Sequence, residues 1–294
     1  MTSRHLHAWA VIAAGFSALL GSVTAAAGAE PVILAPVSPW NVDWSATTCS
    51  LRRAFGSKED PSVLTIERYG PTNFFHLSIT SNEFKSFQQG QSLQLKFGEN
   101  KPRRITSVSP GKSGSSGKAI LFFASQSLSQ PIETDDDSWD PPVTPAMEAA
   151  VKSISVGYFG RERVFATGPL DKPFAALSKC TDDLVSTWGL DPKQQATLIA
   201  RPRPSGRPNT WIRPADYPRA MLTAGKQALV SFRLMVDAVG TPTACEIQRS
   251  YNDKKFDEVT CALLIRRARF SPALDAKGQP VSSYYLNTVR WIMG

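Results

Sequence analysis

The sequence predicts an α+β protein with two domains: a β-rich α+β N-terminal domain over residues 30–189 and a small C-terminal domain over residues 212–294. Two observations predict this class. The first part of the chain carries many short apolar segments bounded by Gly, Pro and Asn, whereas the second has the order strand, strand, helix, strand. Residues 190–211 between them are rich in Pro and Arg, which predicts a short, stiff and extended linker.

The C-terminal elements follow from their periodicity. Residues 228–237 alternate apolar and polar side chains, which predicts a strand with one buried face. A turn and a second strand over residues 241–249 complete an antiparallel hairpin. Asn252 or Asp253 can cap the following helix, whose apolar residues recur at helical spacing. A last strand over residues 281–292 completes an antiparallel three-stranded sheet with helices on one face.

Five short patterns occur in order within this domain. They are Tyr-Pro at 217–218, Val-Asp at 236–237 followed by Gly240, Phe-Asp at 256–257, Phe270 with Pro272 and Ala273, and Gly278 with Pro280 and Val281. Together they resemble the C-terminal domain of TonB-family energy transducers over about residues 212–294. The resemblance implies a periplasmic domain that binds an extended segment of an envelope partner, such as an outer-membrane TonB-dependent transporter, by strand addition. It also implies a link to energy-transduced transmembrane transport.

The family uses its last strand for this contact, which here is residues 281–291. The partner-binding residues that the resemblance implies are Tyr217, Pro218, Val281, Tyr284, Leu286, Val289 and Trp291. Family members often carry a Gln shortly before Tyr-Pro, whereas this chain has Arg213, Pro214, Ala215 and Asp216 there. The alternative function is a non-energised envelope adaptor or structural protein, in which the unrecognised N-terminal domain holds the specific role. Homodimerisation is left open.

Residues 1–29 have the pattern of a secretory signal peptide. Arg4 precedes an apolar stretch over residues 8–20, and Ala27, Gly28 and Ala29 fit a cleavage site. Export to the periplasm is therefore expected. Because residues 8–29 would be just long enough to span a bilayer, an uncleaved segment would instead anchor the chain in the inner membrane, facing the periplasm. Membrane association is expected only in that case.

The exported chain has an even number of cysteines, which in an oxidising compartment favours disulfides. Cys245 lies on the second strand of the C-terminal hairpin, and Cys261 lies on the helix that follows. A strand and its covering helix bring such residues within bridging range, which leaves Cys49 and Cys180 for each other. Four free buried thiols are the alternative.

Composition argues against several classes of function. The net charge of +8 comes without a zinc-knuckle spacing, an RNP-type motif or a long basic run, so no nucleic-acid partner is expected. His76 is the single histidine after residue 29; it shares a strand face with Phe74 and Ser78, so we expect it to be exposed or half-buried. One histidine excludes multi-histidine metal sites.

Two further motifs lack their required partners. The Gly/Ser/Lys segment at residues 109–118 fails the phosphate-loop spacing and is interpreted as a hairpin tip. The acidic stretch at residues 133–140 lacks the Gly and Glu of a calcium loop and is interpreted as a surface loop. No catalytic residues, metal or cofactor are therefore predicted, and we expect a protein that is not an enzyme.

One long helix is expected in the N-terminal domain. Asp171 is placed to cap it, and Gly189 is placed to end it. Its buried stripe is expected to comprise Phe174, Leu177, Thr181, Leu184 and Trp188. Residues 30–39 are rich in Pro and are expected to be loose.

Overall fold

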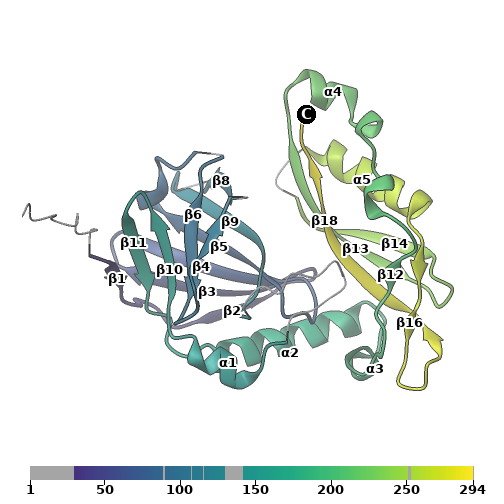
Figure 1. Cartoon of the computed structure of the whole chain (residues 1–294), viewed down its shortest axis with the longest axis horizontal. Coiled ribbons are helices and arrows are strands. Elements are labelled where there is room, and N and C mark those ends of the chain that lie inside the picture. Colours follow the sequence, from purple (N-terminus) through teal and green to yellow (C-terminus); the bar gives the residue numbers. More distant parts are fainter. Residues whose placement is uncertain are drawn as a thin grey trace, which may run out of the picture.

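The computed structural model describes residues 30–88, 90–106, 108–114, 116–129, 142–250 and 253–293. The predicted signal peptide at residues 1–29 and the acidic stretch at residues 133–140 lie outside the described residues. Figure 1 shows a β-rich N-terminal domain beside a smaller C-terminal domain, with the helices α2 and α3 along the side that joins them. The predicted α+β class is confirmed.

The N-terminal domain contains two sheets packed face to face. A six-stranded antiparallel sheet has the order β2-β3-β4-β5-β9-β8, and a five-stranded sheet has the order β1-β11-β10-β6-β7. The strands are β1 Val32–Leu34, β2 Asn41–Trp44, β3 Cys49–Gly56, β4 Pro61–Arg68, β5 Phe75–Ser81, β6 Leu93–Phe97, β7 Arg103–Ile105, β8 Val108–Lys112, β9 Ala119–Gln126, β10 Ile154–Tyr158 and β11 Arg161–Phe165. One apolar cluster joins both inner faces, including Phe55, Phe75, Phe97 and Phe165.

The first described segment differs from the expectation. The Pro-rich composition of residues 30–39 predicts a loose segment, but β1 pairs in parallel with β11 and Pro36 forms a bridge to Phe55. The outer edge of β11 offers unpaired backbone groups, and this segment satisfies them.

The helices α1 Pro145–Ala150 and α2 Asp171–Thr187 pack together at one end of the N-terminal domain, and the short helix η1 Asn82–Phe84 follows β5 at the opposite end of the sheet. The cap of α2 is Leu170 rather than Asp171; Asp171 lies inside the first turn, where a carboxylate favours the positive end of the helix dipole. Phe174, Leu177, Thr181 and Leu184 are buried as expected, whereas Trp188 is half-buried and faces the C-terminal domain.

The expectation for His76 was wrong. Its side chain is only 9 % exposed and packs edge-on against Tyr69 and Phe122. His76 lies opposite Glu67 in the β4–β5 register, and Glu67 forms an ion pair with Arg249 of the C-terminal domain. This polar face of the sheet is therefore covered by the second domain, which local alternation of residue types does not reveal.

Residues 190–211 do not form the extended linker that the composition predicts. They contain α3 Pro192–Ala196, β12 Arg203–Pro204 and η2 Pro208–Thr210. β12 pairs with β15, and the Ala200 backbone exchanges hydrogen bonds with Leu274. Pairing with short strands of the C-terminal domain satisfies backbone groups that an extended spacer would leave to water.

The C-terminal domain has the predicted antiparallel sheet, with the order β14-β13-β18 and α5 on one face. Its elements are η3 Pro214–Asp216, α4 Arg219–Thr223, β13 Ala228–Val236, β14 Pro242–Ser250, α5 Lys254–Arg267, β15 Phe270–Ser271, β16 Ala273–Leu274, β17 Pro280–Val281 and β18 Ser283–Trp291. Asp253 caps α5 by accepting a hydrogen bond from the Lys255 amide. The predicted final strand is two pieces, because Val281 pairs with Ala273 while β18 pairs with β13.

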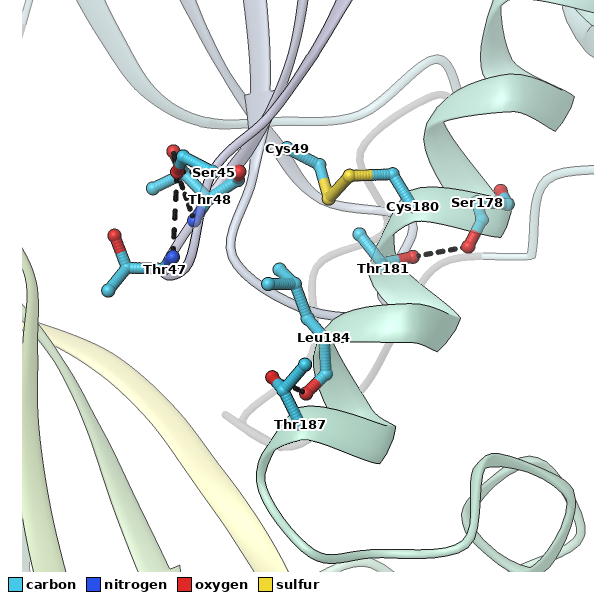
Figure 2. Close-up of a disulfide and its surroundings, with 9 residues drawn as sticks. All are labelled: Ser45, Thr47, Thr48, Cys49, Ser178, Cys180, Thr181, Leu184 and Thr187. Carbon is cyan, nitrogen blue, oxygen red and sulfur yellow. Dashed lines mark hydrogen bonds between the residues drawn. A yellow bond between two sulfur atoms is a disulfide. The ribbon is translucent and has the colours of Figure 1, made fainter.

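Both predicted disulfides are present. Cys245 of β14 is bonded to Cys261 of α5, with 5.5 Å between their Cα atoms. Figure 2 shows the other bridge, in which Cys49 at the start of β3 reaches Cys180 on α2. Nearby, the Ser45 hydroxyl accepts the Thr48 amide hydrogen bond and closes the turn between β2 and β3. The bridges tie each domain's principal helix to its sheet.

Candidate binding edge of the C-terminal sheet

β18 lies at an edge of its sheet. It pairs with β13 over all of its residues without a register shift, and no other strand of the described chain pairs with it. β14 forms the opposite edge, but its pairing with β13 has two register irregularities. Bulges bend and twist a strand, which makes an edge a poor template for another chain. The regular edge of this sheet is therefore β18.

Successive residues of β18 point to opposite faces of the sheet. Tyr285, Asn287, Val289 and Trp291 lie opposite the buried residues of β13 and share the face covered by α5. Tyr284, Leu286, Thr288 and Arg290 share the opposite face, together with Ser231 and Arg233 of β13. We call this second surface the α-free face.

Aromatic packing fixes the far end of β18 on the α5 face. Trp291 is 3 % exposed, its ring lies 5.6 Å from that of Phe256, and its indole N–H donates to Thr260 Oγ1 at 3.0 Å. Tyr217 packs 5.5 Å from Trp291, and its hydroxyl donates to the Lys226 carbonyl at 2.6 Å. The side chains of Tyr217 and Trp291 therefore belong to the core of the domain.

An ion pair holds the segment before Tyr217 against α5. Arg267 donates two hydrogen bonds to the Asp216 carboxylate, at 2.6 and 2.9 Å, and a third to the Trp211 carbonyl at 3.0 Å. Hydrogen bonding to Arg267 lowers the pKa of Asp216 below its usual value. A forked arginine contact of this kind fixes orientation, so the chain entering the domain is held in one position.

The N-terminal domain covers part of the α-free face. The Trp188 ring lies over the Arg233 guanidinium and 5.0 Å from the Tyr284 ring. Burial lowers the pKa of Arg233, and the nearby Glu246 carboxylate opposes that effect. Glu67 forms an ion pair with Arg249, which shares this face at the far edge of the sheet. The domains therefore meet through aromatic and charged side chains.

The remaining residues implied by the family resemblance fall in different environments. Leu286 and Val289 are half-buried on opposite faces of β18. Tyr284 is buried beneath Trp188, and its hydroxyl accepts a hydrogen bond from Arg201 at 3.3 Å. Val281 lies in β17, and Pro218 precedes α4. The structure thus brings Leu286 and Val289 to the edge strand and keeps Val281 and Pro218 away from it.

Sequence reasoning did not assign the N-terminal residues of this contact, namely Glu67, Gly70 and Trp188, to an interface between the domains. Glu67 is a charged residue in β4, and Gly70 follows three residues later, in the turn after that strand. The available signal was Trp188, a large aromatic at the very end of a helix stripe. Nothing in its spacing identifies the strand that it contacts.

This arrangement defines a small α+β domain with β18 at the regular edge of its sheet, paired with β13 alone among the described strands. Residues 213–293 match the family model described as Gram-negative bacterial TonB protein C-terminal. The C-terminal domain is thus of the TonB C-terminal type, and the match does not extend to the N-terminal domain. No curated protein and no solved structure matches the chain.

The helices of the described residues are all too short or too polar to cross a membrane. The longest of them, α2, is an amphipathic helix on the N-terminal core.

Proposed function

We propose that this protein is a periplasmic TonB-like protein whose C-terminal domain binds an extended segment of an envelope partner by strand addition. The position of β18 at the regular edge of its sheet carries the proposal. An unpaired edge offers backbone N–H and C=O groups to another chain, and the TonB-type domain supports a partner in the envelope. The proposed partner is an outer-membrane transporter, and the proposed role is energy-transduced transport without catalysis by this chain.

In this mechanism the backbone supplies affinity and alternate side chains supply selectivity. Leu286 and Val289 are half-buried, so each can lose further apolar surface when a strand is added beside them. Their opposite orientations would let the partner's side chains be selected on both faces of the sheet.

A second candidate is a non-energised envelope adaptor. The packing of residues 190–211 favours it, because Gln195 and Ala200 attach this segment to β16 and β18 instead of leaving a long spacer. In that role the N-terminal domain would hold the specific function, and the C-terminal sheet would provide only a docking contact.

Amide chemical shifts test the strand-addition mechanism. The ¹⁵N-labelled chain is titrated with a ten-residue peptide that alternates Val and Thr around a central Glu. We expect shift changes concentrated on β18, and no changes with the same peptide N-methylated at alternate backbone amides, because methylation removes the ladder donors. Equal responses to both peptides, or changes confined to β14, would exclude strand addition at this edge.

N-terminal sequencing of the protein purified from the envelope separates the two roles. A mature chain that begins at Glu30 favours the adaptor, because a cleaved leader leaves no membrane anchor. Intact residues 1–29 in the inner membrane fraction favour energy transduction.

A further inference from the structure

The N-terminal domain covers one half of β18 more closely than the other. A side chain added to Gly70 would place its Cβ 3.0 Å from Leu286 and 3.2 Å from Trp188, so the turn after β4 lies in direct contact with the first half of the strand. The Trp188 ring covers Tyr284 on the same face. Tyr284 and Leu286 therefore face the N-terminal domain.

The start of β18 is also held from the side by the segment that follows α2. Gln195 is 1 % exposed; its amide N–H donates to the Ser282 carbonyl at 3.0 Å, and its oxygen accepts from the Ser283 hydroxyl at 2.6 Å. Arg201 donates to the Tyr284 hydroxyl at 3.3 Å. A strand added along residues 283–286 would have to displace these contacts.

The second half of β18 has a different environment. Asn287 and Arg290 are exposed, and Thr288 and Val289 are half-buried. Figure 1 shows that the C-terminal end of β18 lies close to α4. The five residues 287–291 extend over about 17 Å, which is enough for a short added strand.

Charge distinguishes this half further. The α-free face carries Arg233, Arg249 and Arg290. Arg233 lies against Trp188 and Arg249 against Glu67, so the N-terminal domain accommodates the first two. Arg290 has no ion pair among the described residues, and it lies at the open end of the edge.

From these contacts we infer that the N-terminal domain limits docking to residues 287–291, and that the partner segment is short and places an acidic side chain beside Arg290. The inference rests on the proposed function and adds the length and charge of the bound segment. A carboxylate on the α-free side of the added strand would lie next to the Arg290 guanidinium, and a cross-strand pair of opposite charge favours one register and one partner.

The test uses the full chain and the same ten-residue Val/Thr peptide with a central Glu, together with its central Lys counterpart. We expect amide shift changes over residues 287–291 only, and binding of the Glu peptide that is about fivefold tighter than that of the Lys peptide. The substitution Arg290→Gln should remove that preference. Equal affinity for both peptides would overturn the assigned charge.

A bulky substitution between the domains tests whether the N-terminal domain limits the length of β18 that a partner can pair with. Gly70→Leu inserts a side chain against Leu286 and Trp188, whereas Gly114→Leu is a matched control with open space around it. Gly70→Leu should extend the shift changes to residues 284–286, and the control should not. Glu67→Gln removes the ion pair with Arg249 at nearly constant side-chain size. It should also weaken the contact between the domains and extend the shift changes to residues 284–286.

The outcomes separate this inference from the proposed function. Shift changes spread evenly over residues 283–291 in the unsubstituted chain would overturn the limit while leaving strand addition in place. The absence of any change on β18 would overturn both.

Discussion

The ring of Trp188 lies 4.1 Å from the guanidinium carbon of Arg233 and so joins the end of α2 to the central strand of the C-terminal sheet. Two guanidinium nitrogens of Arg233, Nε and Nη1, are buried without a hydrogen-bond partner among the described residues. A cation in that position depends on the face of the ring to offset its lost hydration. The pair therefore couples the two domains energetically as well as geometrically.

Replacing Trp188 with Ala should uncouple the domains. The change removes the contacts with Arg233 and Tyr284, which together contribute about 2–3 kcal/mol. We expect urea unfolding to separate into two transitions, with the C-terminal one at lower denaturant concentration. Trp44→Ala is the matched control, because Trp44 is 48 % exposed. A single transition at an unchanged midpoint would show that this contact does not couple the domains.

Gly240 should tolerate no side chain. Its φ is +85°, and a Cβ there would collide with the Phe270 carbonyl, while the Gly240 carbonyl accepts a hydrogen bond from the Phe270 amide at 2.9 Å. Gly240→Ala should therefore lower the free energy of unfolding by well over the roughly 1–2 kcal/mol that a non-glycine residue costs in the left-handed conformation without a clash. Gly278→Ala, at φ +76° in open space, should cost only that smaller amount. Equal thermal midpoints for the two variants would contradict this difference.

The two disulfides should differ in their response to reductant. Cys49 and Cys180 are 0 % and 1 % exposed, whereas Cys245 and Cys261 are half-buried. Because thiol exchange needs access to a sulfur, dithiothreitol under native conditions should open Cys245–Cys261 first. Alkylation and mass spectrometry identify the labelled cysteines. Faster labelling of Cys49 and Cys180 would contradict the prediction, and denaturant should remove the difference.

Loss of the buried Cys49–Cys180 bridge should lower the free energy of unfolding more than loss of Cys245–Cys261. The first bridge closes a loop of 131 residues and the second a loop of 16, which the chain-entropy model converts to about 5 and about 3 kcal/mol. Paired Cys→Ala substitutions compared by urea unfolding give the two losses, and the opposite order would contradict the prediction.

The predictable parts of this structure are those set by local pattern. Alternation along β13, helical spacing along α5 and the cap at Asp253 each depend on neighbouring residues, so the C-terminal fold follows from sequence. The same reasoning predicts the bridge between Cys245 and Cys261, since a strand and the helix that covers it are close in sequence and in space.

The parts that sequence does not predict depend on contacts between distant segments. Gln195 is polar and lies in a Pro-rich segment, yet it is buried because two residues far along the chain satisfy its side-chain amide: the Ser282 carbonyl accepts from its N–H and the Ser283 hydroxyl donates to its oxygen. Helical spacing predicts Trp188 in the core of its own domain, whereas its partners Arg233 and Tyr284 belong to the C-terminal domain. The position of β18 at an edge was implied by family resemblance, and the cover over its first half was not.

Burial of His76 should make stability depend on pH. Desolvation lowers its pKa to about 4, whereas the unfolded chain has a value of about 6.5. As pH falls below 6.5, His76 in the folded state stays neutral while His76 in the unfolded chain gains a proton. The contribution of neutral His76 to the free energy of unfolding is therefore fully present above pH 6.5. It is lost as pH falls toward 4, by up to about 3 kcal/mol. Urea unfolding at pH 7 and pH 4.5 measures the loss. His76→Gln cannot titrate, and the carboxylates are common to both proteins, so the stability difference between them should shrink or reverse at pH 4.5. A difference that is the same at both pH values would show that His76 is accessible to protons in the folded state.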